Sequence, residues 1–304
     1  MTSSHPPDID APFLRSAAID AGWTDDQLAR PAYTRVFHGV HISSNVVLTL
    51  ELRCRACLLI APAESAISGL SAARLWHGIV PDTPGLQVLV PKKSRFSRRG
   101  ITVSRGDIGS DARMTRGVRV TSPERTFTDL ADSLDLVDLV VLGDSLVRRR
   151  VTSVEALVSR SSQVTGRTGR LARRAAGYVR AGVDSPMETR LRMLLVLAGL
   201  PEPRINIQLS DPDGRLSRRI DLAYAVEQLA IEYDGRHHEE TGQRNVDLLR
   251  REDLEAAGWR FVVVVAEHMR NPAGVLNRVV AAMRQRGMAV PQLDQGWRDH
   301  FVSR

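Results

Sequence analysis

Three acidic residues with the spacing of a metal site or a proton-transfer site lie close together in the sequence. Asp221 is followed by Glu232 and Asp234, and the last two belong to the alternating segment Leu229–Asp234. Because successive side chains of a strand face opposite sides, Glu232 and Asp234 share one face. They are expected roughly 7 Å apart along the strand, close enough to hold one divalent cation between them. The sequence therefore predicts a carboxylate site on a hairpin.

Basic and proton-accepting residues follow directly. Arg236, His237 and His238 come after the predicted hairpin, and Arg250 lies one predicted helix later. A histidine has an unperturbed pKa near neutral pH, so His237 or His238 is a candidate to accept a proton from an attacking water. Arg250 is a candidate for a phosphate contact. In the structural alternative the histidines are solvated and Arg250 pairs with Asp247 on an exposed helix face.

The elements that must position these residues are predicted in the last third of the chain. Ser185 and Pro186 open a helix in which Glu188 is the third residue of a capping box and a further candidate for the site. The expected order is α-β-β-β-α-β-α, with strands at 204–209, 217–223, 229–234 and 259–265 and helices at 186–198, 245–257 and 272–284. Two acids on adjoining core strands are costly without a cation, which favours a metal site.

The first 46 residues predict a small module of two helices and a β-hairpin. Residues 12–21 have helical spacing, and Thr24 opens a second short helix with a capping box. Residues 33–42 are expected to be extended, with a turn at His38 and Gly39. A winged-helix module has this outline, in which a helix enters a DNA groove and the hairpin contacts the backbone. A packing or dimerisation element has the same outline.

A basic loop is expected in the middle region, which alternates helices and strands without an obvious catalytic cluster. The loop connects predicted strands at 86–90 and 101–104 and combines cations, hydroxyls and Phe96. This mixture suits contact with a phosphate backbone, and a solvated charged loop is the alternative. Together with Arg236, the candidate nucleic-acid-binding residues are Lys92, Lys93, Arg95, Arg98 and Arg99.

The two cysteines do not predict a zinc site. Cys54 and Cys57 have CxxC spacing, but the chain lacks the second ligand pair of a structural zinc site. Both fall in a predicted helix at 48–59, where thiols three positions apart are expected to be buried or half-buried.

Composition favours a polyanionic partner. The chain has 304 residues and a net charge of +7, mainly from arginine, which makes bidentate contacts to phosphate. A bland basic surface is the alternative. No signal peptide opens the chain and no apolar run approaches the ~20 residues of a membrane span, so we expect a cytoplasmic protein without a membrane partner.

The main domain boundary is predicted at an arginine-rich connector. Serine, threonine and glycine dominate residues 161–169, and arginines flank them. This composition predicts a flexible linker, and two exposed helices with basic faces are the alternative. The expected segments are a winged-helix-like module at 1–46, a mixed α/β middle region with the connector at 47–178, a third domain at 179–290 and a tail at 291–304. The fold class is α/β, in the broad sense that includes α+β.

The third domain resembles the PD-(D/E)XK, or restriction-endonuclease-like, nucleases, and among them the endonuclease-like domains related to very-short-patch mismatch repair endonucleases. The resemblance covers about residues 183–286. Its motifs are Ser185-x-x-Glu188, Ile220-Asp221-Leu222, Ile231-Glu232-Tyr233-Asp234-Gly235 with His237 or His238, and Asp247-x-x-Arg250-x-x-x-Leu254-x-x-x-Gly258-Trp259. The resemblance implies a restriction-endonuclease-like core that hydrolyses DNA phosphodiesters.

The same resemblance implies roles for individual residues. Asp221, Glu232 and Asp234 would hold Mg²⁺ or Mn²⁺, and no organic cofactor is implied. Glu188 would orient the outer shell of the metal. This sequence departs from the wider motif at Asp234, where the nucleases carry a lysine, and Arg236 or a histidine is the candidate replacement. A domain that kept the fold and lost catalysis would share these features.

The amino-terminal region is similar to the winged-helix domain of AbiEi-type antitoxins. The similar motifs are Gly22-Trp23-Thr24, Arg35-Val36-Phe37-His38-Gly39-Val40, Thr121-Ser122-Pro123-Glu124-Arg125-Thr126 and Asp129-Leu130-Ala131. Together the two resemblances imply a DNA endonuclease guided by a DNA-binding module, with DNA as the main partner. The alternative is a non-catalytic DNA-binding regulator of the antitoxin kind. A cognate toxin or a repair protein is then a candidate partner.

Overall fold

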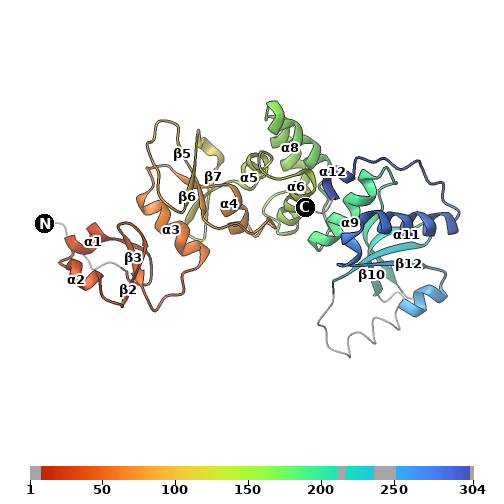
Figure 1. Ribbon diagram of the computed structural model, residues 1–304, viewed down its shortest axis with the longest axis horizontal. Helices are drawn as coiled ribbons and strands as arrows, with labels where there is room; N and C mark the ends of the chain where they lie inside the picture. The colour runs from red at the N-terminus through yellow and green to blue at the C-terminus, as the bar shows by residue number, and fades with distance from the viewer. Residues whose placement is uncertain (1–7, 211–215, 236–250, 302–304) are drawn as a thin grey trace. The chain divides into compact units, whose positions relative to one another are not determined.

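The computed structural model describes residues 8–210, 216–235 and 251–301 (Figure 1). The chain forms two compact units: unit 1 comprises residues 1–133 and 156–172, and unit 2 comprises residues 134–155 and 173–304. Both combine helices with β-sheets, which confirms the expected mixed α/β class. Among the described residues no helix is long and apolar enough to span a bilayer.

Unit 1 begins with a small three-stranded module. It contains β1 (Phe13–Leu14), α1 (Arg15–Asp20), α2 (Asp25–Leu28), β2 (Tyr33–Phe37) and β3 (Val40–Ser43), with strand order β1-β3-β2. The predicted capping box is present, since the backbone N–H of Thr24 donates to Gln27 at 2.7 Å and that of Gln27 donates to the Thr24 hydroxyl at 3.2 Å. Gly39 forms the predicted hairpin turn with φ +80°.

The first helix starts later than its apolar spacing predicts. Residues 13 and 14 pair with β3 instead, with Phe13 opposite His41 and Leu14 opposite Val40. Phe13 packs against Trp23 and Tyr33 in the core of the module. Burial of an aromatic side chain between three elements thus outweighs the local helical pattern.

A five-stranded sheet with order β6-β5-β4-β8-β7 forms the rest of unit 1. The predicted strands are present as β5 (Leu86–Pro91), β6 (Ile101–Gly106) and β8 (Val118–Thr121). Two further strands were not predicted. β4 (Ala66–Ile67) has only two residues, and β7 (Ala112–Thr115) has no buried face that would give an alternating pattern. The accompanying helices are α3 (Leu50–Ile60), α4 (Gly69–Leu75) and α5 (Pro123–Leu130), with a short 3₁₀ turn, η1 (Gly109–Asp111).

The predicted flexible connector is instead helical. Most of its residues fall in α7 (Val154–Ser162) and α8 (Gly166–Tyr178), and residues 163–165 connect the two helices. Leu157 and Ser161 are fully buried in α7, and three alanines of α8 (Ala172, Ala175 and Ala176) are buried as well. The small side chains give the helices a packed face, a feature that the serine- and arginine-rich composition concealed. The alternative of two helices with basic faces therefore describes the connector better.

Both cysteines are buried in α3, as the helical spacing predicts. Burial raises the pKa of each thiol, Cys54 and Cys57, to about 12. At pH 8 only ~10⁻⁴ of such a thiol is ionised, and the thiolate is the reactive form. We expect both thiols of the folded chain to resist Ellman's reagent for hours and to react within minutes in denaturant. Rapid reaction of a folded sample would contradict the burial.

Unit 2 contains a four-stranded sheet with order β12-β11-β10-β9 (Figure 1). Its elements are α6 (Leu136–Arg148), α9 (Pro186–Leu197), β9 (Arg204–Ser210), β10 (Leu216–Tyr224), β11 (Leu229–Asp234), β12 (Arg260–Val265), η2 (His268–Arg270), α11 (Pro272–Gln285) and α12 (Arg298–Phe301). Residues 251–256 are helical, and they are the described part of the helix predicted at 245–257. From α9 to α11 the elements therefore occur in the predicted order.

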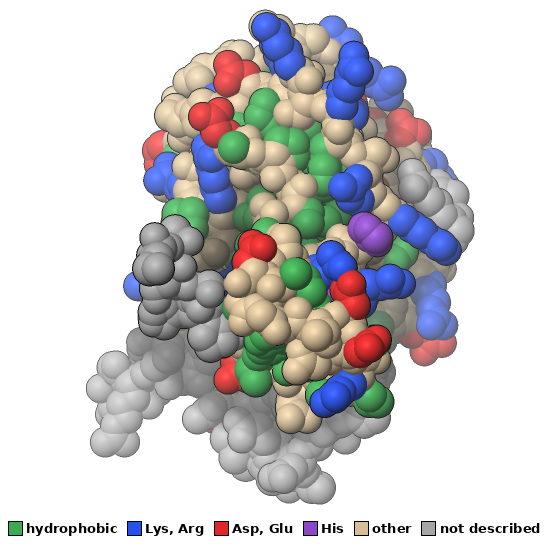
Figure 2. All heavy atoms as spheres, turned by 90° about the vertical axis from the view of Figure 1, so that its left-hand side faces the viewer, with side chains coloured by type: hydrophobic (Ala, Val, Ile, Leu, Met, Phe, Trp, Pro, Cys, Tyr) green, Lys and Arg blue, Asp and Glu red, His purple; other side chains and the backbone are tan. Residues whose placement is uncertain are grey.

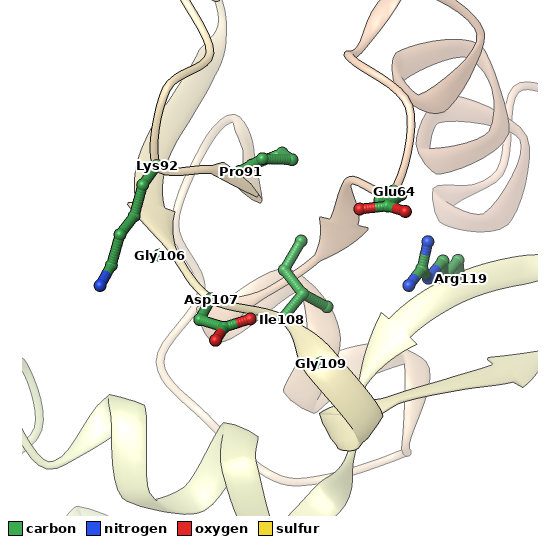
Figure 3. Close-up of a pocket in the computed structure, with 8 residues that line it drawn as sticks. All are labelled: Glu64, Pro91, Lys92, Gly106, Asp107, Ile108, Gly109 and Arg119. Carbon is green, nitrogen blue, oxygen red and sulfur yellow. The ribbon is translucent and has the colours of Figure 1, made fainter.

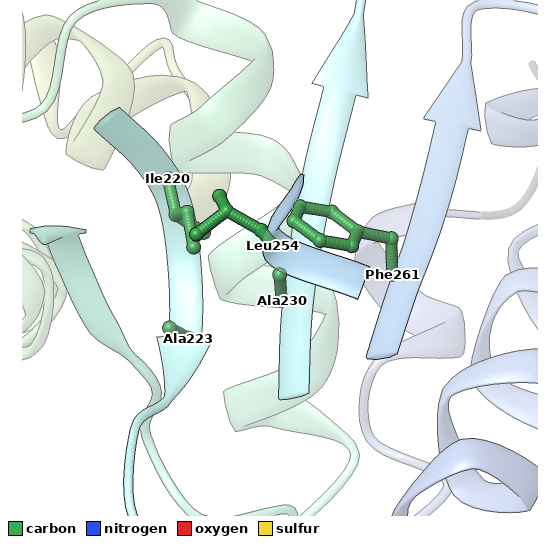
Figure 4. Packing of buried hydrophobic residues seen from close by; sticks show 5 residues of the cluster. All are labelled: Ile220, Ala223, Ala230, Leu254 and Phe261. Atoms are coloured by element: carbon green, nitrogen blue, oxygen red, sulfur yellow. The ribbon is translucent and has the colours of Figure 1, made fainter. Parts of the chain in front are cut away.

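One hydrophobic core cluster of unit 2 packs side chains of β10 and β11 against each other. Ile220 and Ala223 of β10 pack with Ala230 of β11, Phe261 of β12 and Leu254 of the helical segment 251–256 (Figure 4). Ala230 lies between Ala223 and Phe261 in the strand registers, so the three side chains form one row across the sheet. This packing anchors the two strands just before the predicted acidic residues.

Candidate functional site

Strands β10 and β11 stop pairing where the acidic residues begin. Their antiparallel register runs from Tyr224 opposite Leu229 to Leu222 opposite Ile231. Asp221 and Glu232 are the next residue on each strand. There the carboxylate of Asp221 accepts the backbone N–H of Tyr233 at 2.9 Å, a donor that further strand pairing would otherwise use. We call this place, defined by Asp221 and Glu232, the β10–β11 fork.

Strand β9, which pairs with the other edge of β10, has an irregular residue next to the fork. Ile205 pairs with Leu222 and Ile207 with Ile220, which sets Asn206 opposite Asp221. Asn206 has φ +49°, a left-handed conformation that asparagine tolerates better than most residues. Ile220 and Ala223 belong to the same core cluster although regular alternation would put them on opposite faces. The regular pleat is therefore interrupted at Asp221.

Glu188 approaches the fork from α9. It is 7% exposed, and its backbone N–H donates to the N-cap hydroxyl of Ser185 at 3.1 Å. Its carboxylate accepts the backbone N–H of Asp184 at 3.0 Å and the side-chain amide of Asn206 at 3.3 Å. The bonds at Asp184 and Ser185 support the structural interpretation of Glu188 at the helix start. The bond to Asn206 also ties α9 to the strand residue that lies opposite Asp221.

The two acids of β11 differ in exposure. Glu232 is 8% exposed, whereas Asp234 lies at the exposed end of the strand. Both residues pair with β12, where Glu232 lies opposite Val263 and Asp234 opposite Val265. Burial of a carboxylate carries a large desolvation cost that a partner or a cation must offset. Glu232 is therefore the more desolvated carboxylate of the two, and it has interaction partners within the chain.

The remaining predicted site residues lie outside the described part of the chain. These residues are Arg236, His237, His238 and Arg250. Within the described ranges no three His, Cys, Asp or Glu side chains are arranged to hold a metal ion. Mg²⁺, however, is commonly held by one or two carboxylates together with water and substrate phosphate. Asp221 and Glu232 supply two side chains of the type that such a site uses.

The predicted DNA-binding loop lies between β5 and β6. All five predicted cations, Lys92, Lys93, Arg95, Arg98 and Arg99, are exposed, as a phosphate-binding loop requires. Phe96, the aromatic residue of this mixture, is only 5% exposed, so it anchors the loop in the core and its ring is not available for contact with a phosphate backbone. The guanidinium of Arg105 reinforces this anchoring by donating to the carbonyls of Ser94 and Phe96, each at 3.1 Å.

A pocket of about 360 Å³ adjoins this loop (Figure 3). It lies where the parallel strands β5 and β6 end, at Pro91 and Gly106. Lys92 and Asp107 lie on one side, and Glu64 and Arg119 on the other, around the buried side chain of Ile108 (Figure 3). Because the charged side chains of the lining have both signs, this pocket does not by itself favour an anion.

Sequence reasoning missed Asn206 and the backbone N–H of Tyr233. Both take part in the hydrogen bonds that hold Glu188 and Asp221. An asparagine within the strand pattern Arg204–Ser210 was the available signal, since asparagine is depleted in strands and enriched at positive φ.

The chain was compared with protein-family models and with known protein sequences. No protein-family model matches the chain. The chain is similar to two uncharacterized proteins of Mycobacterium tuberculosis, MT2308 of strain CDC 1551 / Oshkosh and Rv2248 of strain H37Rv. Each is 24% identical over 260 residues, which cover 84% of this chain and 94% of the relative. The matched stretch is longer than either unit, so the similarity spans both.

Proposed function

We propose that the chain is a DNA endonuclease that requires a divalent metal and that its catalytic site is the β10–β11 fork. The observation that carries the proposal is the position of Asp221 and Glu232 on adjacent strands at the point where pairing ends. The bond between Asn206 and Glu188 supports it, because it places a third acid on the neighbouring element. Glu188 of α9 thus contacts the strand residue that lies opposite Asp221.

Asp221 and Glu232 would hold Mg²⁺ or Mn²⁺ in this proposal, with Asp234 as a further carboxylate at the exposed end of β11. The ion would neutralise charge on the phosphoryl oxygens and lower the pKa of a bound water. Tyr233 fixes the carboxylate of Asp221 through its backbone N–H. Glu188 holds the side-chain amide of Asn206 opposite Asp221 and so supports its orientation. A proton acceptor would come from His237 or His238.

DNA cleavage tests the proposal. The protein should be incubated with supercoiled, linear, mismatched and single-stranded DNA in the presence of Mg²⁺, Mn²⁺ or EDTA. We expect nicking or cleavage of at least one DNA with Mg²⁺ or Mn²⁺ and none with EDTA. The proposal would be contradicted if the protein bound DNA tightly without metal and cleaved none of these DNAs.

The basic loop between β5 and β6 should contribute phosphate contacts. Replacing Lys93 and Arg95 by glutamine removes two exposed charges without touching Phe96. We expect weaker duplex binding and a shallower salt dependence of log K, by ~0.9 for each phosphate that the loop no longer neutralises. Fluorescence anisotropy at several salt concentrations measures both. The exposed Arg284→Gln in α11 is the control, and an unchanged slope in the double variant would exclude the loop from the interface.

A second candidate function is a non-catalytic DNA-binding regulator. Two observations favour it: the described residues contain no group of three metal-binding side chains, and Asp234 stands where the wider nuclease motif has lysine. Acidic residues that face phosphate weaken DNA binding unless a cation accompanies them. Glu232→Gln therefore discriminates the two functions. It should tighten metal-free DNA binding by a regulator and should abolish cleavage by an endonuclease.

A further inference from the structure

A second pocket lies in the amino-terminal module of unit 1. It has a volume of about 520 Å³, and its lining comes from α1, α2, β2, β3 and the hairpin turn. Its polar side chains are Arg15, Asp25, Tyr33, Arg35, His38 and His41. None of these residues belongs to the β10–β11 fork or to the basic loop. The pocket is therefore independent of the proposed catalytic site.

His41 occupies the centre of a row of three side chains across the sheet. The registers place it opposite Phe13 of β1 on one side and opposite Arg35 of β2 on the other. Directly opposite residues of antiparallel strands project from the same face. The Phe13 ring stacks on the imidazole with a centroid distance of 6.2 Å and an interplanar angle of 30°. Sheet register and stacking thus fix the imidazole between an aromatic wall and a guanidinium.

The imidazole of His41 has an unsatisfied polar atom in this fixed position. His41 is 9% exposed, and its Nδ1 has no hydrogen-bond partner among the described residues. A buried polar nitrogen without a partner costs free energy, and native structures rarely leave one without a reason. His41 belongs to the lining of the pocket, so a ligand that enters the pocket lies next to this side chain.

The charges around His41 favour an anion over a cation. Arg15 and Asp25 form an ion pair, with Nε of Arg15 donating to Asp25 at 2.6 Å, so they largely offset each other. Arg35 and His38 remain at the rim, and Tyr33 completes the set of titratable groups. Burial, followed by the charges of Arg35 and Arg15, lowers the pKa of His41. These charges would repel a metal ion and attract an anion.

The surface of the chain shows the same mixture of charges on a wider scale. On the face that Figure 2 presents, lysine and arginine side chains gather beside a histidine, and acidic side chains lie among them. Such a surface attracts an anion where a basic side chain is not already paired with an acid. An anion is therefore expected to bind arginines that have no acidic partner. Arg15 is already paired with Asp25 and is a weaker candidate for this reason.

We propose that this pocket binds a phosphate group, with Nδ1 of His41 and the guanidinium of Arg35 as its donors. A phosphate offers several acceptor oxygens at once, so it can bind a planar guanidinium and a ring nitrogen together. His38 at the hairpin turn adds a further donor at the rim. The phosphate comes either from the backbone of DNA or from a small phosphorylated molecule.

Titration of inorganic phosphate into the full chain, followed by NMR of the histidine ring resonances, tests the proposal. His41→Gln assigns the His41 signals. We expect saturable shifts of these signals and an upward shift of the His41 pKa, because a bound anion favours the imidazolium. Arg35→Gln should weaken the response at least tenfold, since it removes a charge-assisted hydrogen bond. Arg30→Gln, an exposed arginine outside the pocket, should leave the response unchanged.

A short DNA duplex and a phosphomonoester separate the two sources of phosphate. If the duplex shifts the His41 signals and Arg35→Gln abolishes the effect, the pocket holds a backbone phosphate. If only inorganic phosphate and the phosphomonoester act, it holds a small phosphorylated ligand. Failure of tens of millimolar phosphate to move the His41 signals of the folded protein would overturn the proposal. So would an equal response in Arg35→Gln, a substitution of an exposed side chain that should not disturb folding.

Discussion

Replacing Asp221 by asparagine should abolish metal-dependent DNA cleavage. Asparagine retains an oxygen that can accept the Tyr233 N–H, so the fork should keep its shape while it loses a charge. Loss of a carboxylate ligand is expected to raise the barrier by ~3 kcal/mol or more, which lowers the cleavage rate at least 100-fold. Nicking of supercoiled DNA under single-turnover conditions measures the rate.

A matched substitution controls for a general loss of charge. Glu252→Gln removes one exposed acid from the helical segment 251–256 and should leave the rate within a factor of two of wild type. Glu232→Gln should reproduce the effect of Asp221→Asn, because both residues are assigned to the same ion. Wild-type rates in both fork variants would place the catalytic site elsewhere or attribute the cleavage to a contaminant.

Replacing Arg192 should lower the stability of unit 2 more than any other substitution proposed here. Arg192 of α9 is fully buried and donates to Asp144 of α6 at 2.9 Å and to Glu202 at 3.0 Å. Asp144 also accepts the backbone N–H of Arg180 and the hydroxyl of Thr189, each at 2.8 Å. Arg192→Met leaves Asp144 buried without its cation. The expected cost is about 3–5 kcal/mol in the free energy of unfolding of unit 2.

Chemical denaturation and calorimetry measure this loss, with the transition of unit 2 fitted separately because a two-unit chain need not unfold in one step. The double variant Arg192→Met, Asp144→Leu should recover part of it, since an apolar pair can replace a buried ion pair. Arg251→Gln breaks a partly exposed pair with Glu255 and should cost no more than ~0.5 kcal/mol. A loss below ~1 kcal/mol in Arg192→Met would show that the Asp144 network is not a main support of unit 2.

The pH dependence of this variant follows from the same burial. Desolvation raises the pKa of Asp144, and Arg192 opposes that rise. Without Arg192 the pKa should rise further above its value in the unfolded chain. The folded variant then binds a proton more readily than the unfolded chain, so its stability deficit should be fully present above the raised pKa and should shrink as the pH falls through it.

Local sequence signals predicted most of the elements, and tertiary contacts explain where they failed. The capping box at Thr24 and the strands at 86–90 and 229–234 depend on neighbours in the sequence, so they could be predicted. The first helix begins later than predicted because Phe13 is buried against Trp23 and Tyr33. Phe96 was expected to serve with the cations of the basic loop in contact with a phosphate backbone, but its side chain is buried in the core. In both cases a distant contact outweighs the local pattern.

The candidate site was predictable in its residues more than in its geometry. Alternation along Leu229–Asp234 singled out Glu232, and Asp221 stood out as an acid between apolar neighbours. The end of strand pairing at Leu222 and Ile231 coincides with the left-handed conformation of Asn206 on β9 and lies just beyond the core residue Ala230. No pattern along a single segment contains that information, because it involves β9, β10 and β11 together.

The most direct test of the central claim is the binding of Mn²⁺ at the β10–β11 fork. Electron paramagnetic resonance should be used to count the bound Mn²⁺ in the wild-type chain and in Asp221→Asn, first alone and then with a phosphorothioate duplex that slows cleavage. We predict about one bound ion per wild-type chain with the duplex, competition by Mg²⁺, and loss of this ion in Asp221→Asn. Equal binding by the two proteins, or none by the wild type with DNA present, would contradict the assignment of the fork as a metal centre.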